Sequence, residues 1–273
     1  MVYALINNTI ASLMKETTKD SALEDEALYG MKVEVLEKVI PGWYKIKTHY
    51  RYTGFVHESD LLFDDDKINW WDKAPKMTVI QPYADVLSMP KVQGHHLISL
   101  TRGALVAILE CADENGWIKV SLCDGRVGFM KEKFLGDYIT QWYKEDEDIL
   151  RQSIVNSALS YMGTQYRWGG KSPLGIDCSG LCSMAYMLNG VIIYRDANIV
   201  DGFPVYEIAY ENMKPGDLLF FPGHVAMYIG DYRYVHSTGK NGSDGVVINS
   251  LNPNDSDYRE DLPKILKAIG SIF

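Results

Sequence analysis

The first half of the chain repeats one pattern of short strands and tight turns, and this repeat limits what the chain can fold into. Apolar and polar residues alternate in each copy, and Pro41-Gly42 and Asn115-Gly116 mark equivalent turns. The expected strands are residues 31–39, 43–48 and 53–56 in the first copy and residues 104–110, 117–122 and 127–130 in the second. In both copies a Gly-Trp pair opens the middle strand and a Gly-Phe pair marks the next. The repeat predicts two small β barrels, each closed to protect its edges.

The second half of the chain has a different pattern, with helices first and strands afterwards. Apolar positions near helical spacing predict a helix over about 142–162, behind an acidic first turn. A second helix is expected from Cys178 to about Leu188, where Asn189-Gly190 ends it. The strands expected after it are residues 217–221, 225–230, 232–237 and 245–250. This order predicts an α+β domain with an antiparallel sheet.

We therefore expect three parts. Residues 1–66 form the first barrel, residues 67–138 a linker and the second barrel, and residues 139–273 the α+β domain. The charged segment DDDKINWWDKAPK, which contains Pro75, is interpreted as the linker between the barrels.

Composition narrows the class of protein. With 27 basic and 36 acidic residues the net charge is −9. Proteins that bind nucleic acid usually carry an excess of positive charge, so we expect no nucleic-acid partner. The 47% hydrophobic content predicts a folded core rather than disorder. There is no apolar run long enough to cross a bilayer, so we expect no membrane partner. No basic residue precedes the mildly apolar start, which is not typical of a secretory signal, so we expect a cytoplasmic protein with reduced cysteines.

The stretch YRWGGKSPLGIDCSG, residues 166–180, is the most informative for chemistry. A loop rich in Gly and Pro brings Asp177 and then Cys178 to the start of a helix. At that position the helix dipole and unpaired backbone N–H groups favour a thiolate, and the same N–H groups can receive the oxyanion of a tetrahedral intermediate. Cys178 is therefore a candidate nucleophile rather than an inert buried thiol.

Two histidines follow at a spacing that suits a base and its orienting partner. His224 begins one expected strand and His236 lies near the end of the next, twelve positions later. A hairpin turn at Gly230-Asp231 brings both imidazoles to one face of the sheet. His224 would then take the Cys178 proton while His236 fixes its tautomer.

These motifs resemble those of the NlpC/P60 family of papain-like cysteine peptidases. The similarity rests on DCSG, the upstream YRWGG, the Gly-His pair that opens an apolar strand, and the later His236, and it covers about residues 142–273. The two repeats resemble bacterial SH3 domains. The complete layout is similar to that of the cytoplasmic γ-D-glutamyl-L-diamino acid endopeptidases that recycle murein peptides.

The resemblance implies roles for the residues near the thiol. Cys178 would be the nucleophile, His224 the general base and His236 the third, orienting residue. Tyr166 matches the family tyrosine that helps to hold the oxyanion, and Trp168 would wall the substrate groove.

The resemblance also implies substrate contacts. Asp177 and Ser179 flank the thiol, and an aspartate at this position binds the free amine of an N-terminal L-alanine in the similar enzymes. Arg195 and Asp196 match a segment that contacts the substrate, although Ala197 stands where serine is usual. In the first barrel, Tyr52 and a glutamate would close the end of the groove. Either Glu24 or Glu26 would serve as this glutamate, because Ala22 occupies the position where one is expected.

The implied reaction is hydrolysis of the amide between γ-D-glutamate and a diamino acid in short murein peptides, with no cofactor and no metal. Two alternatives stay open. Cys178, Cys182, His224 and His236 could instead bind zinc, or the barrels could form a non-catalytic module that binds cell-wall peptide or protein. The identity of the diamino acid, the oligomeric state, and the roles of Cys111 and Cys123 are not predicted.

Overall fold

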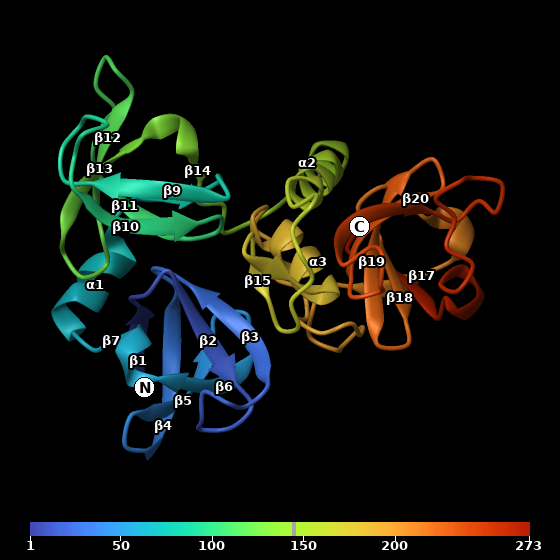
Figure 1. Ribbon diagram of the computed structural model, residues 1–273, viewed down its shortest axis with the longest axis horizontal. Helices are drawn as coiled ribbons and strands as arrows, with labels where there is room; N and C mark the ends of the chain where they lie inside the picture. Colours follow the sequence, from blue (N-terminus) through green and yellow to red (C-terminus); the bar gives the residue numbers. More distant parts are fainter. Residues whose placement is uncertain (144–145) are drawn as a thin grey trace. The chain divides into compact units, whose positions relative to one another are not determined.

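The computed structural model describes residues 1–143 and 146–273. The chain divides into two compact units, Met1–Tyr138 and Ile139–Phe273, which are described separately (Figure 1). In the part of the chain that is described, no helix combines the length and the apolarity needed to cross a bilayer.

The first unit contains two seven-stranded antiparallel sheets with the same strand order. The first sheet runs β3-β2-β6-β5-β4-β1-β7 and the second β10-β9-β13-β12-β11-β8-β14, so each strand of the second has its counterpart seven strands earlier. The first sheet consists of β1 Val2–Ile6, β2 Ile10–Met14, β3 Leu23–Leu28, β4 Lys32–Ile40, β5 Trp43–Thr48, β6 Thr53–His57 and β7 Leu61–Leu62. The second consists of β8 Lys76–Val79, β9 Tyr83–Leu87, β10 His96–Thr101, β11 Leu105–Glu110, β12 Trp117–Ser121, β13 Val127–Lys131 and β14 Leu135–Asp137. The shared topology confirms the internal repeat seen in the sequence.

The charged segment interpreted as a linker does join the two sheets, but residues Asp65–Lys73 within it form helix α1. Asp64 caps this helix by accepting a hydrogen bond from the Lys67 backbone N–H. The helix buries Ile68 and Trp71 in an apolar core to which both sheets contribute. Although most residues of this segment are polar, its two apolar residues pack into the core, and this tertiary packing stabilises the helix.

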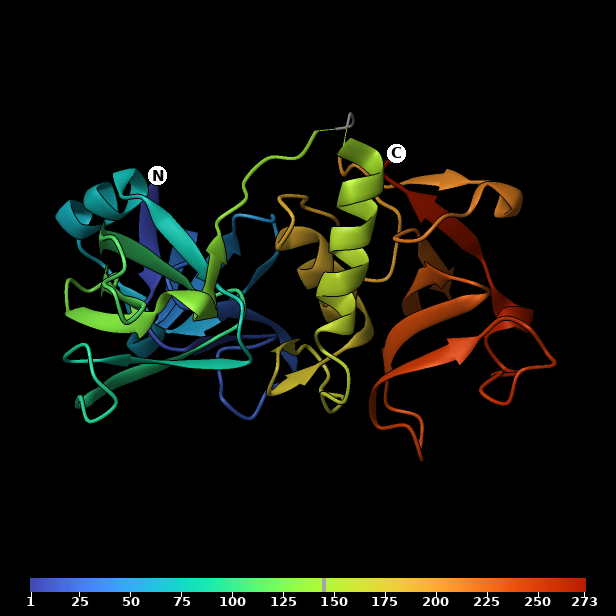
Figure 2. The ribbon, with the colours of Figure 1, turned by 90° about the horizontal axis from the view of Figure 1, so that it is seen from above.

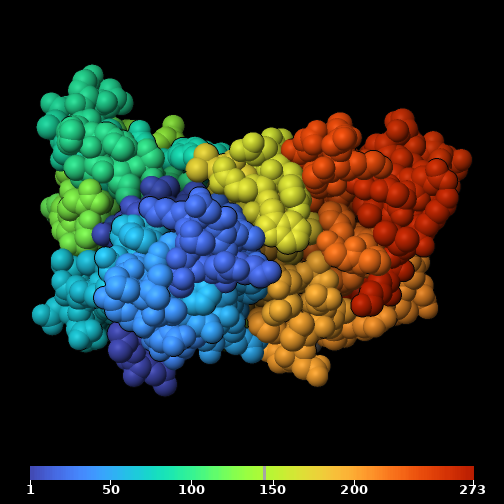
Figure 3. All heavy atoms as spheres, turned by 60° about the horizontal axis from the view of Figure 1, so that its bottom comes forward, coloured from blue at the N-terminus to red at the C-terminus, as the bar shows by residue number. Residues whose placement is uncertain are grey.

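The two sheets of this unit are in direct contact. The indole N–H of Trp71 donates to the Gly30 carbonyl at 2.9 Å, and the Leu105 backbone N–H donates to the Tyr29 carbonyl at 3.0 Å. Gly30 has a φ of 79°, and a Cβ there would lie 2.7 Å from the Trp71 ring, so glycine is required at this contact. The space-filling view shows the blue atoms of the first sheet against the cyan and green atoms of the second (Figure 3).

The second unit has the α+β arrangement that the sequence predicts. Its antiparallel sheet runs β17-β22-β18-β19-β20-β21. The strands are β17 Tyr206–Ile208, β18 Leu218–Phe221, β19 His224–Gly230, β20 Arg233–Thr238, β21 Gly245–Ser250 and β22 Ala268–Ser271, and a separate hairpin joins β15 Lys171–Ser172 to β16 Gly175–Ile176. The sequence missed β17 and β22, which are only three and four residues long.

Two helices complete this unit. Helix α2, Glu147–Leu159, starts later than expected, and Lys144 and Glu145 lie outside the described residues. Helix α3, Cys178–Met187, starts at the expected residue and contacts both α2 and β19 (Figure 2). Its first nine residues are buried, which explains why its sequence is apolar on all sides.

Candidate active site

Asp177 sets the start of α3 and with it the position of Cys178. The Asp177 carboxylate accepts a hydrogen bond from the Gly180 backbone N–H at 2.6 Å, as an N-cap does. A Cβ at Gly180 would lie 2.2 Å from the Gly170 carbonyl oxygen, so only glycine fits under the loop. The Asp-Cys-Ser-Gly sequence thus places the thiol in the first turn of a buried helix.

Cys178 is only 7% exposed, and this burial opposes the thiolate that the sequence analysis expects at the start of a helix. Burial first, and the Asp177 carboxylate second, raise the pKa of Cys178 to about 11. Hydrogen bonds from the backbone at Val225 and Ser179 act in the opposite direction but are outweighed. The resting sulfur is therefore a thiol at neutral pH, and the helix terminus alone does not make it a thiolate.

His224 and His236 lie side by side on one face of the sheet, as the predicted hairpin requires. Nε2 of His224 is 2.8 Å from Nδ1 of His236, and the ring planes meet at 78°. Val225, which follows His224, hydrogen-bonds to the Cys178 sulfur through its backbone, so this end of β19 adjoins the thiol. Burial lowers the pKa of His224 to about 4 and that of His236 to about 3. Both imidazoles are therefore neutral at pH 7 and able to accept a proton.

Sequence reasoning missed Asn249, which contacts the second histidine. Its Oδ1 lies 2.9 Å from Nε2 of His236. Asn249 is on β21, opposite Tyr234 of β20, and strand alternation gives it the same face as His236. A lone amide after the apolar residues Val246–Ile248 is the signal that could have found it.

Tyr166 and Trp168 come from the loop before α3. Burial and the neighbouring Cys178 thiol raise the pKa of Tyr166 to about 12, so its hydroxyl stays protonated and can donate a hydrogen bond. Trp168 is 67% exposed, which suits a residue at the wall of a groove. Their catalytic and binding roles remain predictions.

Arg195 is a buried partner of Asp177 rather than a residue presented to substrate. Its guanidinium is bidentate on the carboxylate at 3.0 Å for each contact, and it also donates to the Ser179 hydroxyl at 2.8 Å. The Asp177 oxygens further accept from the Gly169 backbone and the Ser179 hydroxyl. Any contact between Asp177 and a substrate amine must be made in addition to these internal ones.

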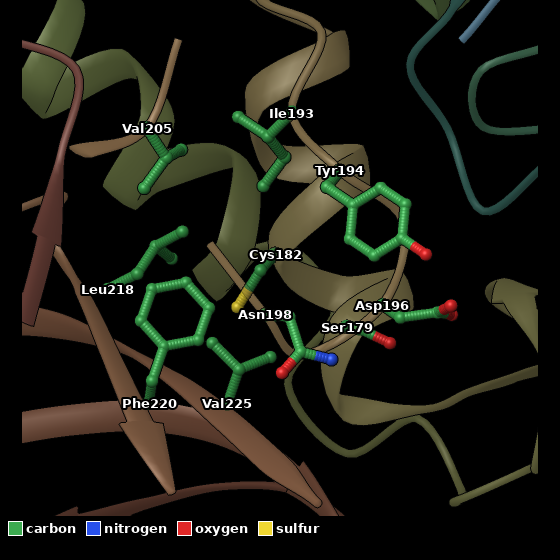
Figure 4. A pocket seen from close by; sticks show the side chains of 10 residues that line it. All are labelled: Ser179, Cys182, Ile193, Tyr194, Asp196, Asn198, Val205, Leu218, Phe220 and Val225. Carbon is green, nitrogen blue, oxygen red and sulfur yellow. The ribbon is translucent and has the colours of Figure 1, made fainter. Parts of the chain in front are cut away.

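A small pocket lined by Cys182 brings together two of the predicted substrate residues, Ser179 and Asp196. Figure 4 shows their polar groups near Tyr194, with apolar side chains on the opposite wall. A hydrogen bond with Asp196 contributes to the raised pKa of the Tyr194 hydroxyl, so tyrosine and carboxylate are adjacent. Ala197 lines a neighbouring pocket with Gly223, the residue before His224.

The zinc alternative does not match this geometry. Both ring nitrogens of His236 are engaged in hydrogen bonds, and Cys182 is fully buried behind the thiol. Over residues 1–143 and 146–273, no three His, Cys, Asp or Glu side chains are grouped as metal ligands.

The remaining candidate residues lie in the first unit. Tyr52 directly precedes β6, and Glu24 and Glu26 are on β3. Their contribution to a substrate groove stays a prediction. Cys123, for which the sequence predicted no role, is buried where the two sheets meet, and its backbone N–H donates to the Tyr29 hydroxyl at 2.9 Å. Cys111 is exposed.

Comparisons with known proteins agree with this architecture. The profile of the NlpC/P60 family matches residues 163–259, and that of the bacterial dipeptidyl-peptidase SH3 domain matches residues 13–61. A protein of Lysinibacillus sphaericus named dipeptidyl-peptidase 6 is 44% identical over 272 residues, which cover 99% of each chain. A γ-D-glutamyl-L-lysine dipeptidyl-peptidase of Bacillus cereus is 27% identical over 81% of this chain and 68% of its own length.

The fold also has a solved counterpart. A crystal structure of an NlpC/P60 family protein from Bacillus cereus superposes with a TM-score of 0.78 over 98% of both chains, at 21% identity. Together with the 44% identical relative and the matched profiles, this places an SH3-like region before a papain-like domain. The chain belongs to the NlpC/P60 family of cysteine peptidases.

Proposed function

We propose that the protein hydrolyses the amide between the γ-carboxyl of D-glutamate and a diamino acid in short murein peptides with a free N-terminal L-alanine. The observation that carries the proposal is the Cys178 thiol at the head of α3, next to the strand that bears the hydrogen-bonded His224 and His236. The names of two relatives, γ-D-glutamyl-L-lysine dipeptidyl-peptidases of Bacillus cereus and Bacillus subtilis, support this substrate class.

The first step begins from neutral groups. Because burial keeps Cys178 protonated and His224 unprotonated at pH 7, the thiol transfers its proton to His224 as the sulfur attacks the γ-carbonyl carbon. Negative charge then develops on the carbonyl oxygen. The Tyr166 hydroxyl and backbone N–H groups at the start of α3 are the donors available to stabilise it.

The second step separates the products. The imidazolium of His224 gives its proton to the amine of the diamino acid, the C–N bond breaks, and a thioester to Cys178 remains. A water molecule then loses a proton to His224 and attacks the thioester carbon. The L-Ala-γ-D-Glu dipeptide leaves with a free carboxylate, and the proton returns to the sulfur.

Selection of a free amine requires a negative charge at the far end of the dipeptide. Asp196 and Asp177 are the carboxylates next to Ser179, and Asp196 lines a small pocket together with Ser179, the residue that follows Cys178. A carboxylate opposite an ammonium is a charge-assisted contact that an acetylated amine cannot make.

The test is an incubation of the protein with L-Ala-γ-D-Glu-diamino acid tripeptides, read by mass spectrometry. We expect release of the L-Ala-γ-D-Glu dipeptide, no cleavage of the N-acetylated peptide, and no product from Cys178→Ala. Parallel lysine and diaminopimelate peptides identify the preferred leaving group. Equal cleavage of blocked and free peptides would disprove amine selection while leaving peptidase activity intact.

The same assay decides the alternative function. A non-catalytic module that binds cell-wall peptide or protein predicts binding without any product. A role in murein recycling in the cytoplasm stays a prediction, and localisation of the tagged protein by fractionation tests it.

A further inference from the structure

Three side chains on neighbouring strands form a continuous chain of hydrogen bonds that ends at the proposed base. Asn249 contacts His236 at 2.9 Å, and His236 contacts His224 at 2.8 Å. The three residues come from β21, β20 and β19 in that order. The chain of hydrogen bonds therefore crosses the sheet perpendicular to its strands and ends at His224, whose neighbour Val225 hydrogen-bonds to the Cys178 sulfur through its backbone.

The far end of this chain is held by a backbone carbonyl. The Asn249 Nδ2 group donates to the Asp257 carbonyl oxygen at 2.7 Å. The Ser250 backbone N–H donates to the same oxygen at 3.2 Å, and the Ser250 hydroxyl donates to the Asp255 carboxylate at 2.7 Å. The Arg233 guanidinium also donates to the Asp257 carboxylate. The loop that carries this carbonyl is thus tied to β20 and β21 at several points.

A carbonyl oxygen can only accept a hydrogen bond, and this fixes the direction of every bond in the chain. The amide N–H of Asn249 must face Asp257, so its oxygen must face His236. Nε2 of His236 must then carry the proton, which leaves Nδ1 as an acceptor. Nε2 of His224 must donate to that acceptor, and Nδ1 of His224 keeps its lone pair.

We propose that Asn249 is a positioning residue that sets the tautomers of His236 and His224 and so leaves Nδ1 of His224 unprotonated to receive the Cys178 proton. The inference deepens the proposed function, because it assumes that His224 acts as the general base. Asn249 acts only through the histidines, and no bond to it forms or breaks during the reaction.

The charges around the histidine pair agree with two neutral rings. Arg259 and Asp261 are the charged residues that act on both rings, with opposite sign, and they are ion-paired with each other. Burial has a larger effect than either of them on both rings. A neutral amide preserves this balance, whereas a carboxylate at position 249 would favour an imidazolium.

The kinetic test compares two substitutions at one site, with the cleavable tripeptide as substrate. Asn249→Leu removes both hydrogen bonds at similar volume, and we expect kcat to fall by about 10²-fold with little change in KM. Asn249→Asp keeps an acceptor for His236, so it should recover most of kcat. Its charge should also move the acid limb of the kcat/KM profile upward by about one pH unit, because the pair then protonates at higher pH.

Asn252→Leu is the matched control. It removes a half-buried amide three residues later, one that contacts Asp255 and not the histidines, so kcat should be retained. Wild-type kcat in Asn249→Leu would overturn the proposal. Equal losses in the Leu and Asp variants, with an unshifted pH profile, would also overturn it and indicate a purely structural role.

A second measurement does not depend on any substrate. In ¹⁵N-histidine NMR spectra of the full-length protein, we expect His224 and His236 to carry their protons on Nε2 at pH 7. Asn249→Leu should remove this preference for His236, and His224→Gln and His236→Gln assign the signals. An Nδ1–H tautomer for either ring in the wild type would refute the proposal even if the peptide is cleaved. The expected tautomers without cleavage would refute only the proposed substrate.

Discussion

The guanidinium of Arg195 meets the carboxylate of Asp177 in two contacts of 3.0 Å each, directly beneath the first turn of α3. Arg195 is 1% exposed, so the contact is fully enclosed by protein. The residue before Cys178 is thereby fixed by a residue that lies eighteen positions later in the chain.

Replacing Arg195 by methionine should destabilise the second unit by about 3–5 kcal/mol, because it leaves the Asp177 carboxylate buried without its partner. Arg195→Lys should fall between methionine and wild type, since lysine keeps the charge but not the bidentate geometry. Hydrogen exchange of peptides from α3 reports on this unit alone. Lys264→Met, which breaks an exposed ion pair with Glu260, is the control and should change stability by less than about 1 kcal/mol. Wild-type protection in Arg195→Met would contradict the role assigned to this pair.

Alkylation of Cys178 by iodoacetamide should be slow at pH 7 and rise about tenfold per pH unit up to pH 10, because only the thiolate reacts and the pKa is raised to about 11. Mass spectrometry of tryptic peptides resolves Cys178 from the exposed Cys111, which serves as a reference for access. A plateau in the rate below pH 8.5 would show instead that the thiolate is preformed, as the helix terminus alone suggests.

Acid should destabilise the second unit through its two buried histidines. The pKa values of His224 and His236 are lowered from 6.5 to about 4 and about 3, so the unfolded chain binds more protons between these values and 6.5. Above pH 6.5 the two histidines do not lower the free energy of unfolding. As the pH falls from 6.5 toward 4, they lower it by at most about 1.4 kcal/mol per pH unit for each histidine.

Urea unfolding followed by hydrogen exchange of β19 and β20 peptides, between pH 4.5 and 7, measures this slope. His236→Gln removes one titrating group and should reduce the slope of the free energy of unfolding against pH, whatever the effect of the substitution on stability at pH 7. An equal slope in wild type and variant would mean that other groups cause the acid sensitivity.

Removing the Tyr166 hydroxyl should affect turnover more than binding. Because its pKa is raised to about 12, Tyr166 is a donor throughout the working range, and Tyr166→Phe should lower kcat by about 10²-fold at similar KM. Trp168→Leu, at the exposed wall, should instead raise KM and leave kcat nearly unchanged. Unchanged kcat in Tyr166→Phe would remove this residue from the proposed oxyanion site.

Much of the fold could be predicted because its signals are local. Alternating residues with Gly-Trp and Gly-Phe pairs located the central strands of both sheets, and the Asp-Cys-Ser-Gly sequence located the start of α3. The spacing of His224 and His236 around a hairpin turn was enough to place both rings on one face. In each case the residues are separated in sequence by no more than about the length of one hairpin. The periodicity of the backbone is then sufficient to predict their relative positions.

The failures have a different origin. The helix α1 within the linker was not predicted because charged residues dominate the segment, yet Trp71 of this helix is buried in a core formed by two sheets. Asn249 looked like any polar residue at the end of a strand until it was found within hydrogen-bonding distance of His236.

The positions of the central strands, of Cys178 at the start of a helix and of the two adjacent histidines could thus be predicted from residue order, because they follow from local propensities and from the backbone repeat. The protonation of Cys178, the internal pairing of Asp177 and the hydrogen bond that orients His236 were not. They depend on how much water is excluded and on which distant groups become neighbours, and both arise only when the chain packs.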